Sequence, residues 1–324
     1  MEPRLTYFGW KGVQVAALVA ACVVLIILVD HPLLQVANAI LLAFTYGQIG
    51  LLGHDAGHRQ VSRKHPWLND IVGHACGFLT ALSSTWWSTQ HNIHHAHPNR
   101  EGSDPDIDIP ILAYSEEQAR AKTGLARFIV KYQGFLVFPI MMLTTVSLRT
   151  TSMRFIANEF REGRGRKVII DLCLIIAHAA VYLWLLFTFL PAWTAVLFLV
   201  VHQLLWGLYM GMVFAPNHKG MPILGPDDKV DYLREQVLTS RNVRSHPVID
   251  FWYGGLNFQI EHHLFPNMPR HNLRRAQPIV QSFCAERDTP YYETGLLRSY
   301  WEIAHHMYEV SQAVRTSTNR TPSA

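Results

Sequence analysis

Histidines are concentrated at a few places in this chain, and their spacing is suited to binding metal. The sequence has 18 histidines in 324 residues. About half of them fall in His54-Asp-Ala-Gly-His58, His91-Asn-Ile-His94-His95, Gln259-Ile-Glu-His262-His263 and the single His218. Residues three or four positions apart lie on one face of a helix, so each cluster can direct its imidazoles the same way. Eight imidazoles are too many for one zinc ion, which takes three or four protein ligands, and they predict two metal ions.

Imidazole binds iron, copper, zinc and nickel, so the ligand type alone leaves the metal open. Other polar residues in or beside the clusters are candidates for hydrogen bonds to the ligands. A carboxylate that accepts from a ligand imidazole fixes its tautomer, which is the role expected of Asp55 and Glu261. His97, close to the second cluster, is a candidate of the same kind. Isolated histidines such as His305 are expected on the surface or in structural contacts.

Long apolar runs predict the helices that must position these clusters. Hydrophobic residues make up 49% of the chain and charged residues 16%, against about 25% charged residues in soluble domains. Four runs are long enough to cross a bilayer, at residues 12–29, 33–52, 168–190 and 192–215. Asp30-His31-Pro32 and Pro191 leave only short turns between them. The sequence therefore predicts an all-α integral membrane protein with four transmembrane helices in two hairpins.

The orientation follows from the basic stretch between Arg154 and Lys167, which directly precedes the third run. Basic residues beside a span favour the cytoplasm, which places both termini and every histidine cluster there as a histidine-rich di-metal cap. Two weaker apolar stretches, Ile71–Trp87 and Tyr132–Val146, are predicted to be interfacial or partly buried helices. A span at Ile71–Trp87 would separate the first two clusters across the membrane.

The predicted membrane domain covers residues 1–285, with the cap at 53–167 and 216–285, and a C-terminal helical segment and tail cover 286–324. Short helices are expected at Asp231–Leu238 and Leu297–Ala313, followed by a disordered tail, Thr316–Ala324. A basic set near the third cluster is expected to dock an acidic redox partner or a lipid phosphate, or only to mark the cytoplasmic face. It comprises Arg241, Arg244, Arg270, Arg274 and Arg275. Nothing in the sequence indicates binding of nucleic acid.

The three clusters resemble the histidine boxes of the membrane fatty-acid desaturases. Gln259 in the first place of the third box, with Leu264–Asn272 after it, resembles the front-end group in particular. Asp104-Pro-Asp-Ile107 and Gly254-Gly-Leu-Asn-Phe258 share this resemblance. It implies a centre of two iron ions that uses O2 to dehydrogenate an acyl chain. The implied ligands are His54, His58, His91, His94, His95, His218, His262 and His263.

The resemblance leaves two residues open and implies a partner. Gln259 stands where many relatives have another histidine, so direct metal binding by its amide is undecided, and Asn217 could hold a metal-bound water. Many front-end enzymes carry a fused cytochrome b5 domain with a His-Pro-Gly-Gly motif. His31-Pro32 and His246-Pro247 are not followed by Gly-Gly. The expected electron donor is therefore a separate protein, a ferredoxin or a cytochrome b5 with its reductase.

The expected chemistry can also be argued without the family. The C–H bonds in the middle of an alkyl chain are not acidic enough for a side-chain base, so their removal needs a redox metal and O2. Substrates would be lipid- or CoA-linked fatty acyl chains, lying in an apolar slot whose candidate lining includes Trp86, Trp87, Trp206, Tyr209 and Phe214. Alternatives are a di-iron acyl hydroxylase, a zinc-dependent membrane hydrolase and a metal transporter. A metal transporter would need histidines distributed along the transmembrane helices, whereas these are predicted to cluster at one end.

Overall fold

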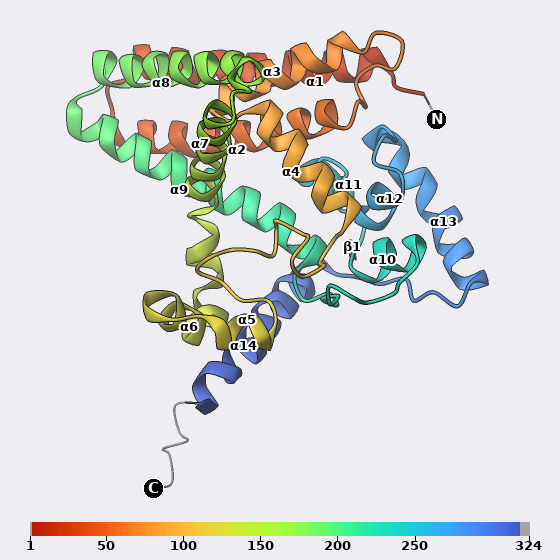
Figure 1. Cartoon of the computed structure of the whole chain (residues 1–324). Coiled ribbons are helices and arrows are strands. Elements are labelled where there is room, and N and C mark those ends of the chain that lie inside the picture. The colour runs from red at the N-terminus through yellow and green to blue at the C-terminus, as the bar shows by residue number, and fades with distance from the viewer. Residues whose placement is uncertain (1, 318–324) are drawn as a thin grey trace, which may run out of the picture. The chain divides into compact units, whose positions relative to one another are not determined.

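The computed structural model describes residues 2–317, and in them the secondary structure is almost entirely helical (Figure 1). The predicted all-α fold is confirmed. Contacts between residues divide the described chain into two compact units. Unit 1 comprises residues 2–89, 141–211 and 267–270, and unit 2 comprises residues 90–140, 212–266 and 271–317.

Unit 1 contains four long apolar helices that pack side by side (Figure 1). They are α1 (Leu5–Leu28), α2 (Pro32–Gly57), α8 (Ile169–Phe189) and α9 (Ala192–His218), the last continuing into unit 2. No other single helix among the described residues is long and apolar enough to cross a membrane. They confirm the four predicted spans, and Pro32 and Pro191 lie at the turns of the two hairpins.

Polar side chains inside the second span fasten it to the first. The amide of Gln35 donates to the carbonyl oxygens of Leu25 at 2.8 Å and Val29 at 2.6 Å. The amide of Asn38 donates to Cys22 O at 3.0 Å. Because a bilayer core offers no water to polar groups, they must be satisfied within the protein. Gln35 and Asn38, which interrupt the second apolar run with polar side chains, therefore hold the first hairpin together.

Each of the two weaker apolar stretches is broken between two helices. The first contains the end of α3 (Trp67–Thr80) and the start of α4 (Ser84–Ala96), and the second contains the end of α6 (Gly124–Met141) and the start of α7 (Thr144–Arg161). The second break packs against α9, since a Cβ atom on Gly207 would come within 2.3 Å of Met142 O. Whether these helices lie at the membrane interface stays a prediction.

Unit 2 is built from short helices around two small apolar cores. One core joins Val237, Ile260, Val280 and Cys284, and the other joins Val130 to Val310 and Val314. Two-residue strands pair in parallel across the unit, β1 (Asn242–Val243) with β2 (Glu293–Thr294). Besides most of α4 and α6 and the end of α9, its helices are α5 (Glu116–Ala121), α10 (Tyr232–Leu238), α11 (Pro247–Trp252), α12 (Gln259–Leu264), α13 (Arg270–Glu286) and α14 (Leu296–Ser317).

The two short helices predicted after residue 230 are confirmed by α10 and α14. The disordered tail was predicted to begin at Thr316, but Thr316 and Ser317 still belong to α14. This helix continues past Val310 and Val314, whose burial against α5 and α6 stabilises its last turns. Residues 318–324 of the predicted tail lie outside the described residues. The predicted domain boundary at residue 285 stays a prediction.

The turn between α3 and α4 is held by a buried carboxylate of α8. Asp171 is 3% exposed, and it accepts hydrogen bonds from Ser83 Oγ at 2.7 Å, Ser84 Oγ at 3.1 Å and Thr85 N at 3.2 Å. Ala81, just before, has a φ of +55°, which non-glycine residues rarely adopt. The strained turn thus fixes where α4 begins, and α4 carries the second histidine box.

Replacing Asp171 with Ala should lower the free energy of unfolding by about 2–3 kcal/mol, because buried donors lose their acceptor. Asp171→Asn, which keeps one acceptor oxygen, should cost less. Denaturation of the purified protein in detergent, followed by circular dichroism, measures both. The control is Asp30→Ala at the exposed turn between α1 and α2. Equal stability of Asp171→Ala and Asp30→Ala would contradict this account of the turn.

Candidate metal centre

Six of the eight predicted histidine ligands lie in unit 2. They are His91, His94 and His95 on α4, His218 at the end of α9, and His262 and His263 on α12. One ring nitrogen each from His94, His218 and His263 lies within 4.8 Å of the other two. The Nε2 atoms of His94 and His218 are 3.3 Å apart. These three buried imidazoles, brought together from three helices, form the core of the site.

The tautomer of each of these three histidines is set by its Nδ1 atom. Nδ1 of His94 donates to the Asp104 carboxylate at 3.0 Å, and Nδ1 of His218 donates to Thr239 O at 3.0 Å. Nδ1 of His263 donates to Gln236 Oε1 at 3.0 Å. With the proton on Nδ1, Nε2 carries a lone pair. All three rings therefore offer Nε2 as the atom available to a metal.

Asp104 is the charged member of this set of acceptors. It is 2% exposed, and besides His94 it accepts from the backbone nitrogens of Asn99 at 2.7 Å and Asp106 at 2.9 Å. Burial alone would raise the pKa of Asp104, but the His94 ring and the Lys219 ammonium group lower that pKa below its ordinary value. The carboxylate stays ionised at neutral pH, which strengthens its bond to His94.

The other three histidines of unit 2 lie against this core. His95 stacks on His263 with ring centroids 4.2 Å apart, and its Nε2 lies 3.1 Å from Nε2 of His91. The ring centroid of His262 is 4.7 Å from that of His95 and 6.4 Å from that of His91. His262 is fully buried, whereas His91 is half-buried. The second and third boxes thus converge within one unit, as expected from their spacing.

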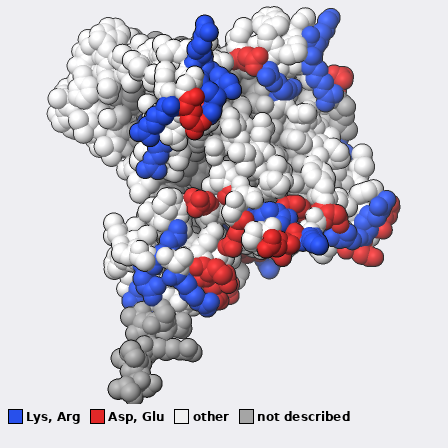
Figure 2. Space-filling view, viewed as in Figure 1, with Lys and Arg blue, Asp and Glu red and all other residues white. Residues whose placement is uncertain are grey.

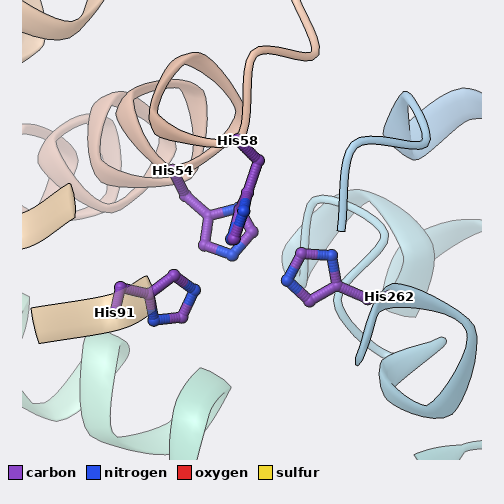
Figure 3. Close-up of side chains that lie close together, drawn as sticks. All are labelled: His54, His58, His91 and His262. Atoms are coloured by element: carbon purple, nitrogen blue, oxygen red, sulfur yellow. The ribbon is translucent and has the colours of Figure 1, made fainter. Parts of the chain in front are cut away.

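His54 and His58 belong to unit 1, at the carboxyl end of α2. Their ring centroids are 4.7 Å apart, so the i, i+4 spacing does bring them to one face. The Trp87 ring covers both, at 5.3 Å from His54 and 5.9 Å from His58. A Cβ atom on Gly57 would come within 2.2 Å of that ring, so the glycine leaves room for it. Figure 3 shows the side chains of His54 and His58 together at the end of α2.

Gln259 and Asn217 are both buried beside His218. The Gln259 amide nitrogen donates to Nε2 of His218 at 2.9 Å, which is the lone pair that a metal would take. Gln259 Oε1 and both polar atoms of the Asn217 side chain are buried, with no hydrogen-bond partner among the described residues. Both residues therefore lie beside His218 with polar side-chain atoms that could contact a ligand or water, and their roles stay predictions.

Asp55 contacts an arginine more closely than a histidine. Its carboxylate lies 3.6 Å from Nδ1 of His54, beyond hydrogen-bond distance, and forms a buried ion pair with Arg270. Arg270 also donates to Leu51 O at 2.7 Å, and its backbone nitrogen donates to Gln60 Oε1 at 3.1 Å. This ties the segment after the third box to the helix that carries the first box.

The remaining predicted residues lie further from the rings. Glu261 accepts from the Asn242 amide at 2.8 Å and from the Tyr291 hydroxyl at 2.7 Å, and burial raises its pKa. His97 is exposed just after α4. The predicted basic set is not one surface patch, because Arg241 and Arg270 are buried in ion pairs with carboxylates. The sequence of the basic set did not show that Arg241 and Arg270 would be buried.

The position of His218 depends on a proline two residues earlier in α9. Pro216 has no N–H group, so the carbonyl of Met212 loses its partner within α9. The hydroxyls of Tyr253 at 3.2 Å and Tyr300 at 3.0 Å donate to that carbonyl instead. Arg241 donates to the carbonyls of Pro216 at 2.6 Å and Lys219 at 3.0 Å, which places a positive charge at the end of the helix.

The residues of unit 2 fit a bound metal ion. His263 Nε2 is buried and has no hydrogen-bond partner among the described residues. Three imidazoles, each with Nδ1 bonded to an acceptor and Nε2 left for a ligand, show the arrangement by which proteins orient metal-binding histidines. Of the three acceptors, the sequence pattern pointed only to the Asp104 segment. Gln236 and Thr239 carry no motif, and only the fold brings them to the rings.

Comparison with known proteins agrees with this geometry. The family model described as Fatty acid desaturase matches residues 31–295, which include all three histidine boxes. The chain belongs to the fatty acid desaturase family. The predicted resemblance is thereby confirmed, and relatives with names of the front-end kind support the assignment to that group.

Three relatives in the desaturase family illustrate the similarity. The acyl-lipid (9-3)-desaturase of Physcomitrium patens is 30% identical over 320 residues, 95% of this chain and 59% of that protein. The Delta(8)-fatty-acid desaturase of Euglena gracilis is 32% identical over 265 residues, 78% of this chain and 62% of that protein. The Delta(6)-fatty-acid desaturase fat-3 of Caenorhabditis elegans is 31% identical over 303 residues, 90% of this chain and 67% of that protein. The chain thus spans about three fifths of the length of the first two.

Asp104→Ala should weaken binding of a divalent metal about 10–100-fold, because His94 loses the carboxylate that fixes its tautomer. Titration of the metal-free protein with Co2+, followed by its absorption spectrum, measures this without any activity assay. Asp108→Ala removes an exposed carboxylate from the same loop and should leave the affinity unchanged. Equal affinities of the two variants would contradict the role of Asp104.

Arg270→Ala should lower the free energy of unfolding by about 3–5 kcal/mol, because it leaves the buried Asp55 carboxylate unpaired. The double variant Asp55→Asn with Arg270→Gln should recover part of the loss, since no unpaired charge remains. Chemical denaturation in detergent gives both values, and Arg274→Ala, which removes an exposed side chain of the same helix, is the control. The assignment fails if Arg270→Ala is no less stable than Arg274→Ala.

Proposed function

We propose that this chain is an O2-dependent fatty acyl desaturase that inserts a cis double bond into a lipid- or CoA-linked acyl chain. The observation that carries the proposal is the set of three buried imidazoles with Nδ1 bonded and Nε2 directed to one place, in a chain of the desaturase family. Relatives named acyl-lipid desaturases favour a lipid-linked substrate.

We propose two iron ions as the cofactors, held by the eight box histidines. His94, His218, His263 and the stacked His95 would hold one ion. The resemblance implies that the other four box histidines, His54, His58, His91 and His262, hold the second ion. Gln259 and Asn217 would bind a ligand or a water beside the first. Iron supplies activation of O2, which the removal of hydrogen from an unactivated C–H bond requires.

The protein's own groups would hold this centre and keep water from it. Asp104, Thr239 and Gln236 keep three ligand imidazoles in the tautomer that leaves Nε2 for the metal. The Trp87 ring covers the first box from one side. Trp86, Trp206 and Tyr209 are buried in unit 1, as expected for side chains lining an apolar slot or packing the bundle.

The balance of the reaction supports a redox partner. Forming a double bond removes two hydrogen atoms with two electrons from the substrate, whereas reducing O2 to two waters takes four electrons. Two further electrons must come from a donor, and we propose a separate ferredoxin or cytochrome b5. The basic stretch before α8 favours a cytoplasmic location for the site and both termini.

Expression in a host of known lipid composition should yield new double bonds, whose positions mass spectrometry of the acyl chains determines. His262→Ala should abolish the product, whereas the matched His305→Ala, outside the boxes, should retain it. Metal analysis should find about two irons and no zinc. A hydroxyl group without a new double bond would overturn desaturation in favour of hydroxylation. Zinc in place of iron would favour a hydrolase, and an unchanged product from His262→Ala would overturn the site assignment.

A further inference from the structure

Helix α6 is apolar on two opposite faces. One face, with Val130 and Val137, is buried, and Val130 belongs to the apolar core that includes Val310 and Val314 of α14. The other face is exposed and consists of Leu125 (73%), Phe128 (59%), Tyr132 (37%), Phe135 (68%) and Phe138 (39%). These positions recur every three or four residues, so they form one stripe along the helix. A helix that is apolar all round is typical of burial in protein or membrane.

We call these five residues the α6 stripe. An apolar stripe of this length indicates a surface that does not face water. Its five residues extend over about 20 Å at 1.5 Å per residue. A contiguous exposed apolar surface of this kind marks an interaction site. The chain has four helices suited to crossing a bilayer, so a membrane is available to cover the stripe.

Two cations beside the middle of the stripe identify what covers it. The Arg315 guanidinium carbon lies 5.7 Å from the ring centroid of Tyr132, 5.5 Å from that of Phe135 and 5.1 Å from that of Tyr308. The Lys131 ammonium group lies 5.7 Å from the Tyr132 ring. Charges cannot lie deep in hydrocarbon, but Lys and Arg extend to the headgroups while their stems cover apolar surface. This combination is typical of helices that lie in the membrane interface.

A close approach of two helices brings Arg315 to this place. A Cβ atom on Gly134 of α6 would come within 2.7 Å of the Tyr308 backbone in α14, so the two backbones touch there. Arg315 Nε donates to Lys131 O at 2.9 Å, which fixes the guanidinium over the rings. Figure 2 shows Lys and Arg side chains among uncharged surface in the region of α6 and α14. The two basic side chains are thus held together at the edge of the stripe.

We propose that α6 lies in the plane of the membrane surface, with the α6 stripe among the acyl chains and Arg315 and Lys131 bound to the phosphates of anionic lipids. The alternative is that α6 and α7 together make one broken span. The proposal does not depend on the metal centre or on the reaction proposed above. It assigns unit 2 a lipid-binding surface of its own.

The depth of α6 in a bilayer tests the first part. Single cysteines in the Cys173→Ser background carry spin labels at Leu125, Phe128, Phe135 or Phe138. In phosphatidylcholine–phosphatidylglycerol vesicles, the accessibility of each label to O2 and to a water-soluble nickel complex gives its depth. An in-plane helix gives the four labels similar depths, whereas a span gives depths that change by about 1.5 Å per residue. A label at the exposed Glu117 of α5 is the aqueous control. Graded depths, or stripe labels as accessible to nickel as Glu117, would overturn the proposal.

Lipid preference tests the second part. A bimane label at position 128 is quenched by doxyl-labelled phosphatidylglycerol or phosphatidylcholine, and the ratio of the two reports local enrichment of anionic lipid. Arg315→Gln and Lys131→Gln should each lower the enrichment about fivefold, whereas Arg244→Gln, an exposed arginine elsewhere in unit 2, should not change it. Circular dichroism checks that each variant is folded. Enrichment that is absent in the wild type, or unchanged when both charges are removed, would overturn the lipid-phosphate site.

Discussion

A buried imidazole can offer a lone pair on one nitrogen only if the other nitrogen has an acceptor for its proton. Three segments of unit 2 meet this constraint for His94, His218 and His263. The loop after α4 supplies Asp104, the helix α10 supplies Gln236, and the residue after α10 supplies Thr239. Each acceptor is in turn held by other contacts, as when the Gln236 amide donates to His95 O at 3.1 Å. The order of the rings therefore depends on residues that would bind no metal themselves.

The helices and the shared faces of the clustered histidines were predictable because their signals are local. Apolar runs of about 20 residues identify spans, and i, i+3, i+4 spacing identifies a shared face, so both α2 and α4 present their histidines as expected. The breaks within the weaker stretches were not predictable. They depend on Asp171 and Gly207, which are distant in sequence from the turns they stabilise.

Charged residues show the same limit. Arg270 and Arg244 are alike in sequence, yet Arg270 is buried against Asp55 while the side chain of Arg244 is 72% exposed. A basic pattern reports how many charges there are, but their burial depends on which carboxylates the fold brings close. Asp104, in contrast, stood in a segment that the family resemblance singled out, although its contact with His94 needed the structure.

The hydrogen bonds to the carbonyl of Met212 link the C-terminal helix to α9. Its two hydroxyl partners come from Tyr253, after α11, and Tyr300, in the first turn of α14, and both bonds lie just before the residue pair Asn217 and His218. The C-terminal helix α14 therefore supports the end of α9 that carries His218. A chain shortened before residue 300 would lose one support of α9 close to His218.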